Sequence, residues 1–224
     1  MDLGVEVVPP ALAVEPGTVG CMEVRVHNPG ADVCDAAVVV AGEVARWSWV
    51  HPATCSLAAG ADATVAVFFK PPCGPAPRAG CFGFEVRVTP AGATTAAAPT
   101  GCGRGTVEVR PYLDVVASID PPAWWDRRAA AFTLRLENRG NVATSAALAG
   151  SDLLGELAVA VEPSRLAVDP GETSTAAVRV EARKALGGKG ERRLPFVVTA
   201  ECEGCSALRA DGSFYQLGRR APAH

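Results

Sequence analysis

Met22-Glu-Val-Arg-Val-His-Asn-Pro-Gly30 is an alternating stretch that runs into an Asn-x-Gly turn, and it recurs as Phe132-Thr-Leu-Arg-Leu-Glu-Asn-Arg-Gly140. In both copies every second residue is apolar, and the residues between are polar or charged. Successive side chains of a strand point to opposite faces of its sheet, so a period of two predicts a half-buried β-strand. Asn and Gly supply the turn that follows. The second copy begins about half the 224-residue length after the first, which predicts two units.

A second phrase, Pro-x-x-Leu-x-Val-x-Pro-Gly, spans Pro9 to Gly17 and returns at Pro163 to Gly171. A degenerate copy runs from Pro52 to Gly60, where Leu57 holds an apolar position. Proline lacks a backbone donor and belongs at strand starts or sheet edges, and Pro-Gly is a strong turn signal. Each copy therefore predicts a short edge-like strand that begins after a proline and stops at a tight turn.

The remaining patterning completes the fold prediction. Short apolar runs separated by turn residues at intervals of roughly ten residues are typical of antiparallel β-sandwiches, and no stretch has sustained helical periodicity. We predict an all-β chain of two tandem immunoglobulin-like antiparallel sandwiches at residues 1–111 and 112–218, with a flexible tail at 219–224. Strands are expected near residues 3–8, 11–15, 20–28, 34–41, 46–50, 63–70, 81–89, 105–111, 112–119, 130–138, 143–149, 156–161, 174–182, 193–200 and 212–217. A flexible hairpin loop is expected at 90–103.

These phrases resemble tandem bacterial immunoglobulin-like modules of the kind attached to glycosidases and cell-envelope proteins. The stretch from Tyr112 to Gly140, with Pro121-Pro-Ala-Trp-Trp125 inside it, is similar to actinobacterial two-module proteins of unknown role, some labelled hydrolytic. The resemblance implies the fold and little about activity, because function lies in sites built onto a fold. Antibody-type domains carry an intersheet disulfide, whereas here Cys21 and Cys81 fall on the polar phase of their strands.

Composition excludes several classes of function. The formal net charge of −3 gives no electrostatic case for a nucleic-acid binder. No apolar run approaches the roughly 18 to 20 residues that a membrane helix needs. The N-terminus has no basic segment followed by an apolar one, which favours a cytoplasmic location. The 8 cysteines favour a cell-envelope or extracellular location if they are oxidised, so the location stays open.

Catalysis has little support in the sequence. A Ser-His-Asp system needs a base held in a pocket, whereas His27 lies on the polar phase of a strand, His51 precedes a proline and His224 is the last residue. No Gly-x-Ser-x-Gly elbow is present. We predict a non-enzymatic chain without a cofactor. An enzyme would become credible if His27 or His51 were buried beside a carboxylate in a cleft.

The cysteine pairs suggest disulfides more than metal binding. Cys202-Glu-Gly-Cys205 is a C-x-x-C pair, but no second pair follows to complete a zinc site, and a βαβ context for redox chemistry is missing. A small disulfide or two reduced thiols are favoured there, and a metal shared with Cys102 or with a partner chain is the remaining alternative. Cys73 and Cys81 bracket a Pro- and Gly-rich loop that a disulfide could close.

Two groups of residues are candidates for binding. The glycine-rich loop 182–193 is locally basic, which suits an anionic surface, a polysaccharide or an acidic partner, although such charge runs are often only solvated. Of the four tryptophans, one pair is expected on one face of a strand and the other on opposite faces, with at least one of each pair in core or interdomain packing. An exposed remainder would anchor a partner or a sugar ring. These candidates are Arg183, Lys184, Lys189, Arg192, Arg193, Trp47, Trp49, Trp124 and Trp125.

The sequence therefore favours a structural or protein-interaction module that presents loops and strand edges to a partner, with a short junction near Pro111 between its units. One alternative is an accessory subunit of a larger bacterial assembly, such as an envelope complex or a phage-tail-like particle. The other is a carbohydrate-binding module, which would require two coplanar rings on one accessible face.

Overall fold

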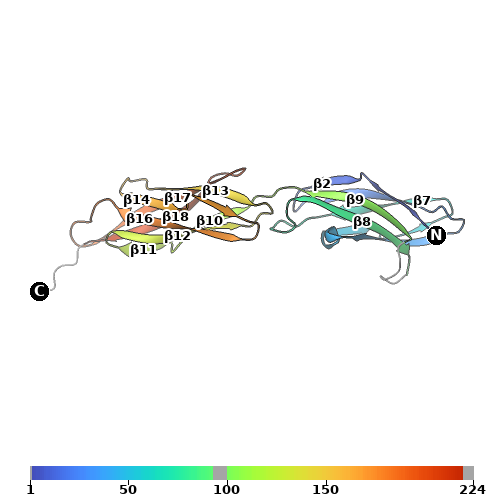
Figure 1. The fold of residues 1–224 in the computed structure, drawn as a ribbon. Helices are drawn as coiled ribbons and strands as arrows, with labels where there is room; N and C mark the ends of the chain where they lie inside the picture. Colours follow the sequence, from blue (N-terminus) through green and yellow to red (C-terminus); the bar gives the residue numbers. More distant parts are fainter. Residues whose placement is uncertain (1, 93–99, 219–224) are drawn as a thin grey trace. The chain divides into compact units, whose positions relative to one another are not determined.

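The chain divides into two compact units, Met1–Tyr112 and Leu113–His224, in a computed structural model that describes residues 2–92 and 100–218. Within each unit, strands far apart in the sequence lie side by side and form two layers (Figure 1). Each unit is considered by itself below. The hairpin residues 93–99 and the predicted tail at 219–224 lie outside the described residues.

Unit 1 is a sandwich of two sheets. One sheet has the strand order β1-β3-β7-β5 and the other the order β2-β9-β8-β4-β6. Neighbouring strands are antiparallel except β2 and β9, which are parallel. The elements are β1 (Gly4–Val8), β2 (Ala11–Val14), β3 (Gly20–His27), β4 (Cys34–Ala41), the short 3-10 helix η1 (Glu43–Trp47), β5 (Ser48–His51), β6 (Thr54–Leu57), β7 (Asp62–Phe69), β8 (Gly80–Pro90) and β9 (Gly101–Val109).

Unit 2 repeats this arrangement strand for strand. Its sheets have the orders β10-β12-β16-β14 and β11-β18-β17-β13-β15, and the parallel pair is again the second and the last strand, β11 and β18. The strands are β10 (Val115–Asp120), β11 (Ala123–Asp126), β12 (Ala129–Asn138), β13 (Thr144–Ser151), β14 (Leu157–Glu162), β15 (Arg165–Val168), β16 (Thr173–Ala182), β17 (Glu191–Cys202) and β18 (Leu208–Leu217).

In both units two segments cross from one sheet to the other at a proline. The crossings β1 to β2 and β5 to β6 contain the cis peptide bonds Val8-Pro9 and His51-Pro52. In unit 2 the equivalent cis bonds are Asp120-Pro121 and Glu162-Pro163. Because proline cannot donate to a ladder, it interrupts pairing in one sheet and lets the chain start a new strand in the other. The chain is thus two tandem immunoglobulin-like β-sandwiches, as predicted.

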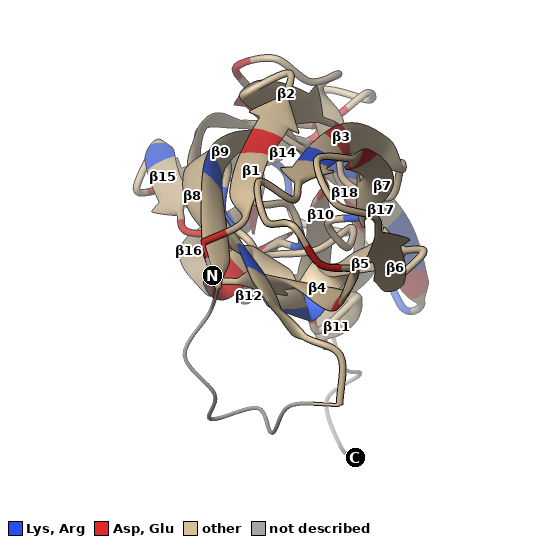
Figure 2. Cartoon of the chain, turned by 90° about the vertical axis from the view of Figure 1, so that its right-hand side faces the viewer, with Lys and Arg blue, Asp and Glu red and all other residues tan. Residues whose placement is uncertain are grey.

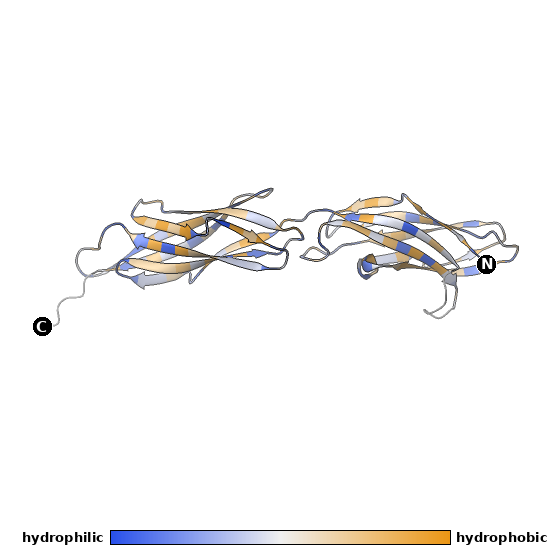
Figure 3. Cartoon of the chain, viewed as in Figure 1, coloured by the Kyte–Doolittle hydropathy of each residue, from blue (hydrophilic) through white to orange (hydrophobic). Residues whose placement is uncertain are grey.

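The buried faces follow the predicted alternation. Met22, Val24 and Val26 of β3 are at most 1% exposed, and Phe132, Leu134 and Leu136 of β12 occupy the equivalent positions at 0 to 3%. Each unit has its own core cluster drawn from both of its sheets. Figure 3 shows apolar and polar positions alternating along the strands. The predicted phase of both strands is confirmed.

The outer faces carry charges of both signs. Arg87 pairs with Glu85 at 2.7 Å and Arg139 with Glu137 at 2.8 Å, each two residues apart on one strand or at its end. Figure 2 shows acidic and basic positions interspersed over the strands. Exposed pairs of this kind contribute little to stability, because water and salt screen them. Within the described residues no helix has the length and apolar character to cross a bilayer.

A buried asparagine ends the third strand of each unit. Asn28 and Asn138 are both 0% exposed. The Asn28 side-chain oxygen accepts from the Gly30 N–H at 3.0 Å, and the Asn138 oxygen accepts from the Gly140 N–H at 2.9 Å. The Asn28 amide also donates to the Leu57 carbonyl at 3.2 Å. The asparagine of each Asn-x-Gly phrase therefore closes the turn that follows it, and Asn28 also bonds to a strand that is distant in the sequence.

Three details differ from the prediction. The loop expected at 90–103 is shorter, because β8 continues to Pro90 and β9 already begins at Gly101. The segment expected as a strand at 46–50 begins as η1, and only Ser48–His51 is extended. The strand β11 was not predicted, because its Ala-Trp-Trp-Asp sequence is too short to show a period of two. The strands β6 and β15 lie within the two proline phrases at 52–60 and 163–171, as those phrases predict.

Candidate functional site

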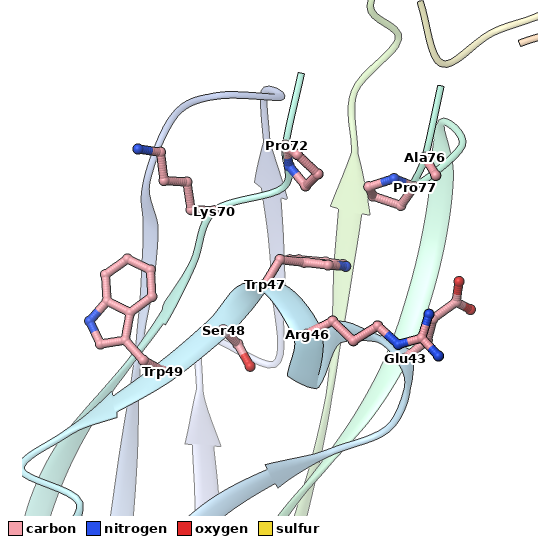
Figure 4. Close-up of a pocket in the computed structure, with 9 residues that line it drawn as sticks. All are labelled: Glu43, Arg46, Trp47, Ser48, Trp49, Lys70, Pro72, Ala76 and Pro77. Carbon is pink, nitrogen blue, oxygen red and sulfur yellow. The ribbon is translucent and has the colours of Figure 1, made fainter. Parts of the chain in front are cut away.

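Unit 1 contains a mostly apolar pocket of about 490 Å³. It is formed where η1 and β5 meet the proline-rich segment between β7 and β8. Figure 4 shows the Trp47 ring below Pro72 and Pro77, with Trp49 and Lys70 on a neighbouring side. The lining residues are Glu43, Arg46, Trp47, Ser48, Trp49, Lys70, Pro72, Ala76 and Pro77.

The two tryptophans of this pocket play different parts. Trp47 ends η1 and is held by edge-to-face contacts with Phe69 and Phe82, each with ring centroids 6.0 Å apart. Trp49 lies on β5, is 45% exposed and stacks on Phe68 at 5.2 Å. The expectation that Trp47 and Trp49 share one face of a strand is wrong, because Trp47 precedes the strand. Trp47 is thus fixed by packing against two phenylalanines, whereas the Trp49 side chain remains accessible to a ligand.

An unpaired strand edge borders the pocket. β5 is the last strand of its sheet and pairs only with β7. The Lys70 N–H donates to the Trp47 carbonyl at 2.8 Å, and backbone groups alternate in direction along an antiparallel strand. The backbone groups of Ser48 and Val50 therefore point away from β7 toward the open edge. The Ser48 Oγ is buried in the pocket wall without a hydrogen-bond partner.

The charged residues at this pocket are Arg46, Lys70 and Glu43. None of the three forms a salt bridge among the described residues. The net charge of the rim is therefore positive, which suits a ligand with an apolar part and a nearby carboxylate. Arg46, Lys70 and the prolines give no signal of a site in the sequence, because they come from segments that only folding brings together.

The second tryptophan pair lies on the edge strand β11 of unit 2. Trp124 and Trp125 are 49% and 51% exposed, so the expectation that one of them packs in a core is not met within unit 2. Trp125 stacks on Tyr215 of β18 with ring centroids 4.6 Å apart and planes at 12°. The rings lie face over face, so the Trp125 face that contacts Tyr215 is not open to a ligand.

The basic loop of unit 2 is partly engaged in structure. Arg192 pairs with Glu156 at 3.0 Å, Arg193 donates to Ser213 Oγ at 3.1 Å, and Arg183 donates to the Leu157 carbonyl at 3.1 Å. Lys184 and Lys189 are exposed and form no salt bridge among the described residues. Three of the five predicted cations thus form hydrogen bonds within unit 2, but Arg183 remains exposed, as are the two lysines.

No catalytic constellation is assembled by the histidines of the described part. His27 Nδ1 lies 2.6 Å from Asp62 Oδ1, but the two side chains are 49% and 73% exposed, and His51 is exposed. A base must be held in a pocket to act on a bound substrate. The condition set for an enzyme, a histidine buried beside a carboxylate in a cleft, is not met by His27 or His51. His224 lies outside the described residues.

All eight cysteines lie within the described residues and are free thiols in this structure. Cys73 and Cys81 are exposed, and their pairing stays a prediction. Cys202 is buried, and Cys205 packs against the same core. The pKa of Cys202 is raised to about 11, mainly by burial of the thiol and to a smaller extent by its hydrogen bond with the Cys205 thiol. Over residues 2–92 and 100–218, no group of three or more His, Cys, Asp or Glu is arranged to hold a metal ion.

Comparison with known proteins assigns the chain to no family. No family model and no curated protein matches it. The D00-D0 domain of intimin is similar over 94% of this chain and 98% of that chain, with a TM-score of 0.40 and 10% identity. The YadV chaperone matches 95% of this chain and 100% of its own, with a TM-score of 0.34 and 14% identity. The CupB2 chaperone of Pseudomonas aeruginosa matches 92% and 98%, with a TM-score of 0.32 and 10% identity.

Proposed function

We propose that the chain is a non-enzymatic protein-interaction module that binds an extended segment of a partner protein along β5. The observation that carries the proposal is the position of the Trp47–Trp49 pocket beside an unpaired strand edge. Adding a strand to an exposed edge supplies main-chain hydrogen bonds, and side-chain pockets supply specificity. Here the open backbone groups of Ser48 and Val50 would pair with the partner segment.

The pocket also suggests the sequence of the partner segment. Trp47, Trp49 and Pro72 make an apolar wall that suits a large apolar or aromatic side chain. Arg46 and Lys70 at the rim suit an acidic residue close to that anchor. Since β5 spans four residues, Ser48–His51, the paired part of the partner segment would be equally short.

The other functions predicted from the sequence remain proposals. An accessory subunit of a larger bacterial assembly would use the same surface, since such a subunit also binds proteins. The similarity to actinobacterial two-module proteins likewise stays a prediction. Carbohydrate binding is less favoured, because Trp49 on Phe68 and Trp125 on Tyr215 are stacked pairs and not two coplanar rings on one face.

The test begins with selection of random peptides of about twelve residues on the full chain, which is long enough both to pair with β5 and to fill the pocket. Affinities of the selected peptides are then measured by calorimetry for the parent and for Val50→Pro. Proline at position 50 removes an edge donor without breaking the ladder to β7. Val50→Ala controls for lost packing, and Val161→Pro is the matched change on the equivalent strand β14.

We expect binding to fall at least about tenfold with Val50→Pro and with Trp49→Ala, and to persist in Val50→Ala and Val161→Pro. Selected peptides should share an apolar anchor next to an acidic residue. Failure to select any peptide, or binding that is indifferent to both Val50→Pro and Trp49→Ala, would refute the proposal.

A further inference from the structure

The most exposed large apolar side chains of unit 2 lie together at a loop tip. Leu153 is 84% exposed and Leu154 is 61% exposed, and both lie in the connection between β13 and β14. Scattered single apolar residues are normal on protein surfaces, but two adjacent leucines held in water are not required by the fold. They therefore need a separate explanation.

The loop that carries the leucines is held in one shape. The Asp152 carboxylate accepts hydrogen bonds from the backbone N–H groups of Leu154 at 3.0 Å, Glu156 at 2.5 Å and Leu157 at 2.7 Å. Burial alone would raise the pKa of Asp152, but these three N–H donors, together with the positive charge of nearby Arg183, hold it below its usual value. The backbone is thus fixed with the leucines outward, and their exposure follows from an ordered turn.

Cations lie directly beside the leucines. A pocket of about 380 Å³ is lined by Leu154, Arg183, Lys184, Leu186 and Arg192, together with Gly155, Glu156 and Ala185. Glu156 is matched by Arg192 at 3.0 Å. This leaves Arg183 and Lys184 without a salt bridge within the described residues. An apolar tip and a positively charged hollow therefore meet at one residue, Leu154.

We infer that this end of unit 2 docks on an anionic phospholipid surface, with Leu153 and Leu154 entering the acyl boundary and Arg183 and Lys184 contacting lipid phosphates. Leucine beside Lys and Arg is typical of interfacial membrane binding, in which apolar burial and attraction to anionic lipids act together. Protein-interface hot spots are instead enriched in Trp, Tyr and Arg and poor in Leu.

The test is co-sedimentation of the full chain with vesicles of phosphatidylcholine, with and without about 30% phosphatidylserine, at about 0.1 M salt, where surface charges still act over roughly 10 Å. Variants are Leu153→Asn with Leu154→Asn, and Arg183→Glu with Lys184→Glu. The matched controls in unit 1 are Val33→Asn, which alters a 69% exposed apolar residue, and Arg46→Glu with Lys70→Glu. Thermal unfolding of every variant shows whether unit 2 remains folded.

We expect binding to the anionic vesicles only, weakened at least about tenfold by either unit 2 variant and little changed by the unit 1 controls. A higher salt concentration should weaken the binding of the parent chain to the anionic vesicles. Absence of binding overturns the inference, as does equal loss with the unit 1 charge reversal. If the leucine variant binds normally and inorganic phosphate competes fully, the pocket takes phosphate alone and the lipid inference is wrong. Binding to poly-glutamate but not to vesicles would assign the surface to an acidic protein.

Discussion

The side-chain amide of Asn138 donates a hydrogen bond of 3.1 Å to the backbone carbonyl of Val168, and this bond joins the two phrases that repeat in the sequence. Asn138 belongs to the Asn-x-Gly phrase and Val168 to the Pro-x-x-Leu-x-Val-x-Pro-Gly phrase. The Gly171 N–H at the end of the second phrase returns a bond to the Asn138 carbonyl at 2.8 Å. In unit 1 the partner of Asn28 is the degenerate copy at 52–60, so that copy is the true equivalent of 163–171.

Asn138→Ala should destabilise unit 2 by about 2 to 4 kcal/mol, because it removes the donor to the buried carbonyl of Val168 and to the part-buried carbonyl of Val142. Chemical denaturation of the full chain measures the change. The control is Thr64→Ala at an exposed position of β7, which should stay within about 0.5 kcal/mol. If Asn138→Ala lowers the free energy of unfolding no more than Thr64→Ala does, water replaces the hydrogen bonds of the Asn138 amide without cost and the prediction is wrong.

Val24→Asp should abolish the thermal transition of unit 1 and leave that of unit 2, and Leu134→Asp should do the reverse. Both side chains are 0% exposed, and a buried unpaired charge is very costly. Each unit has a separate core, so calorimetry should resolve one remaining transition in either variant. Loss of both transitions from one substitution would show that the units fold as one.

Gly212→Ala should destabilise unit 2 by about 1 to 3 kcal/mol through overpacking. Gly212 is the cross-strand neighbour of Phe196, and a Cβ there would lie 2.6 Å from the Cε1 atom of that buried ring. Gly105 and Phe84 form the equivalent pair in unit 1, so Gly105→Ala should have a similar effect. Gly83→Ala is the control, since an added Cβ there meets nothing within 4 Å. Equal melting temperatures for all three variants would contradict the packing argument.

Cys202 should react with iodoacetamide more slowly than exposed Cys21 at about pH 8.5 in reducing buffer, because only the thiolate reacts. Its pKa is raised from 9.0 to about 11 in the folded chain. Because the pKa of Cys202 is higher in the folded chain, the thiol of the unfolded chain loses its proton at a lower pH. The stability that comes from keeping the Cys202 thiol protonated is therefore complete below pH 9 and is lost as the pH rises toward 11. Cys202→Ala should remove that part of the pH dependence. Equal labelling of both thiols would contradict the assignment.

The sequence was sufficient for the fold because alternation encodes which face of a strand is buried. Met22, Val24 and Val26 reveal their phase without reference to any other part of the chain. Edge strands are harder to recognise, since β11 has four residues and exposes both of its tryptophans. The 3-10 helix before β5 was also missed, and with it the separate environments of Trp47 and Trp49.

The candidate sites could be predicted only in part. The tryptophans and the basic loop were recognised by residue type, which is visible in a sequence. The prolines above Trp47 come from a segment about thirty residues away, and the role of Arg192 depends on Glu156, which is equally remote. Leu153 and Leu154 gave no signal at all, because a strand and an exposed turn both accommodate a pair of leucines. Exposure and pairing are properties of the fold.

The proline crossings have a further consequence for how the chain behaves when crowded. Because β1–β2 and β5–β6 each divide one long segment between two sheets, every edge strand of unit 1 has only four or five residues. A second copy stacked edge to edge would gain few hydrogen bonds before its own chain turned away. The same break that shapes the sandwich of unit 1 thus limits how far a second copy could extend either of its sheets.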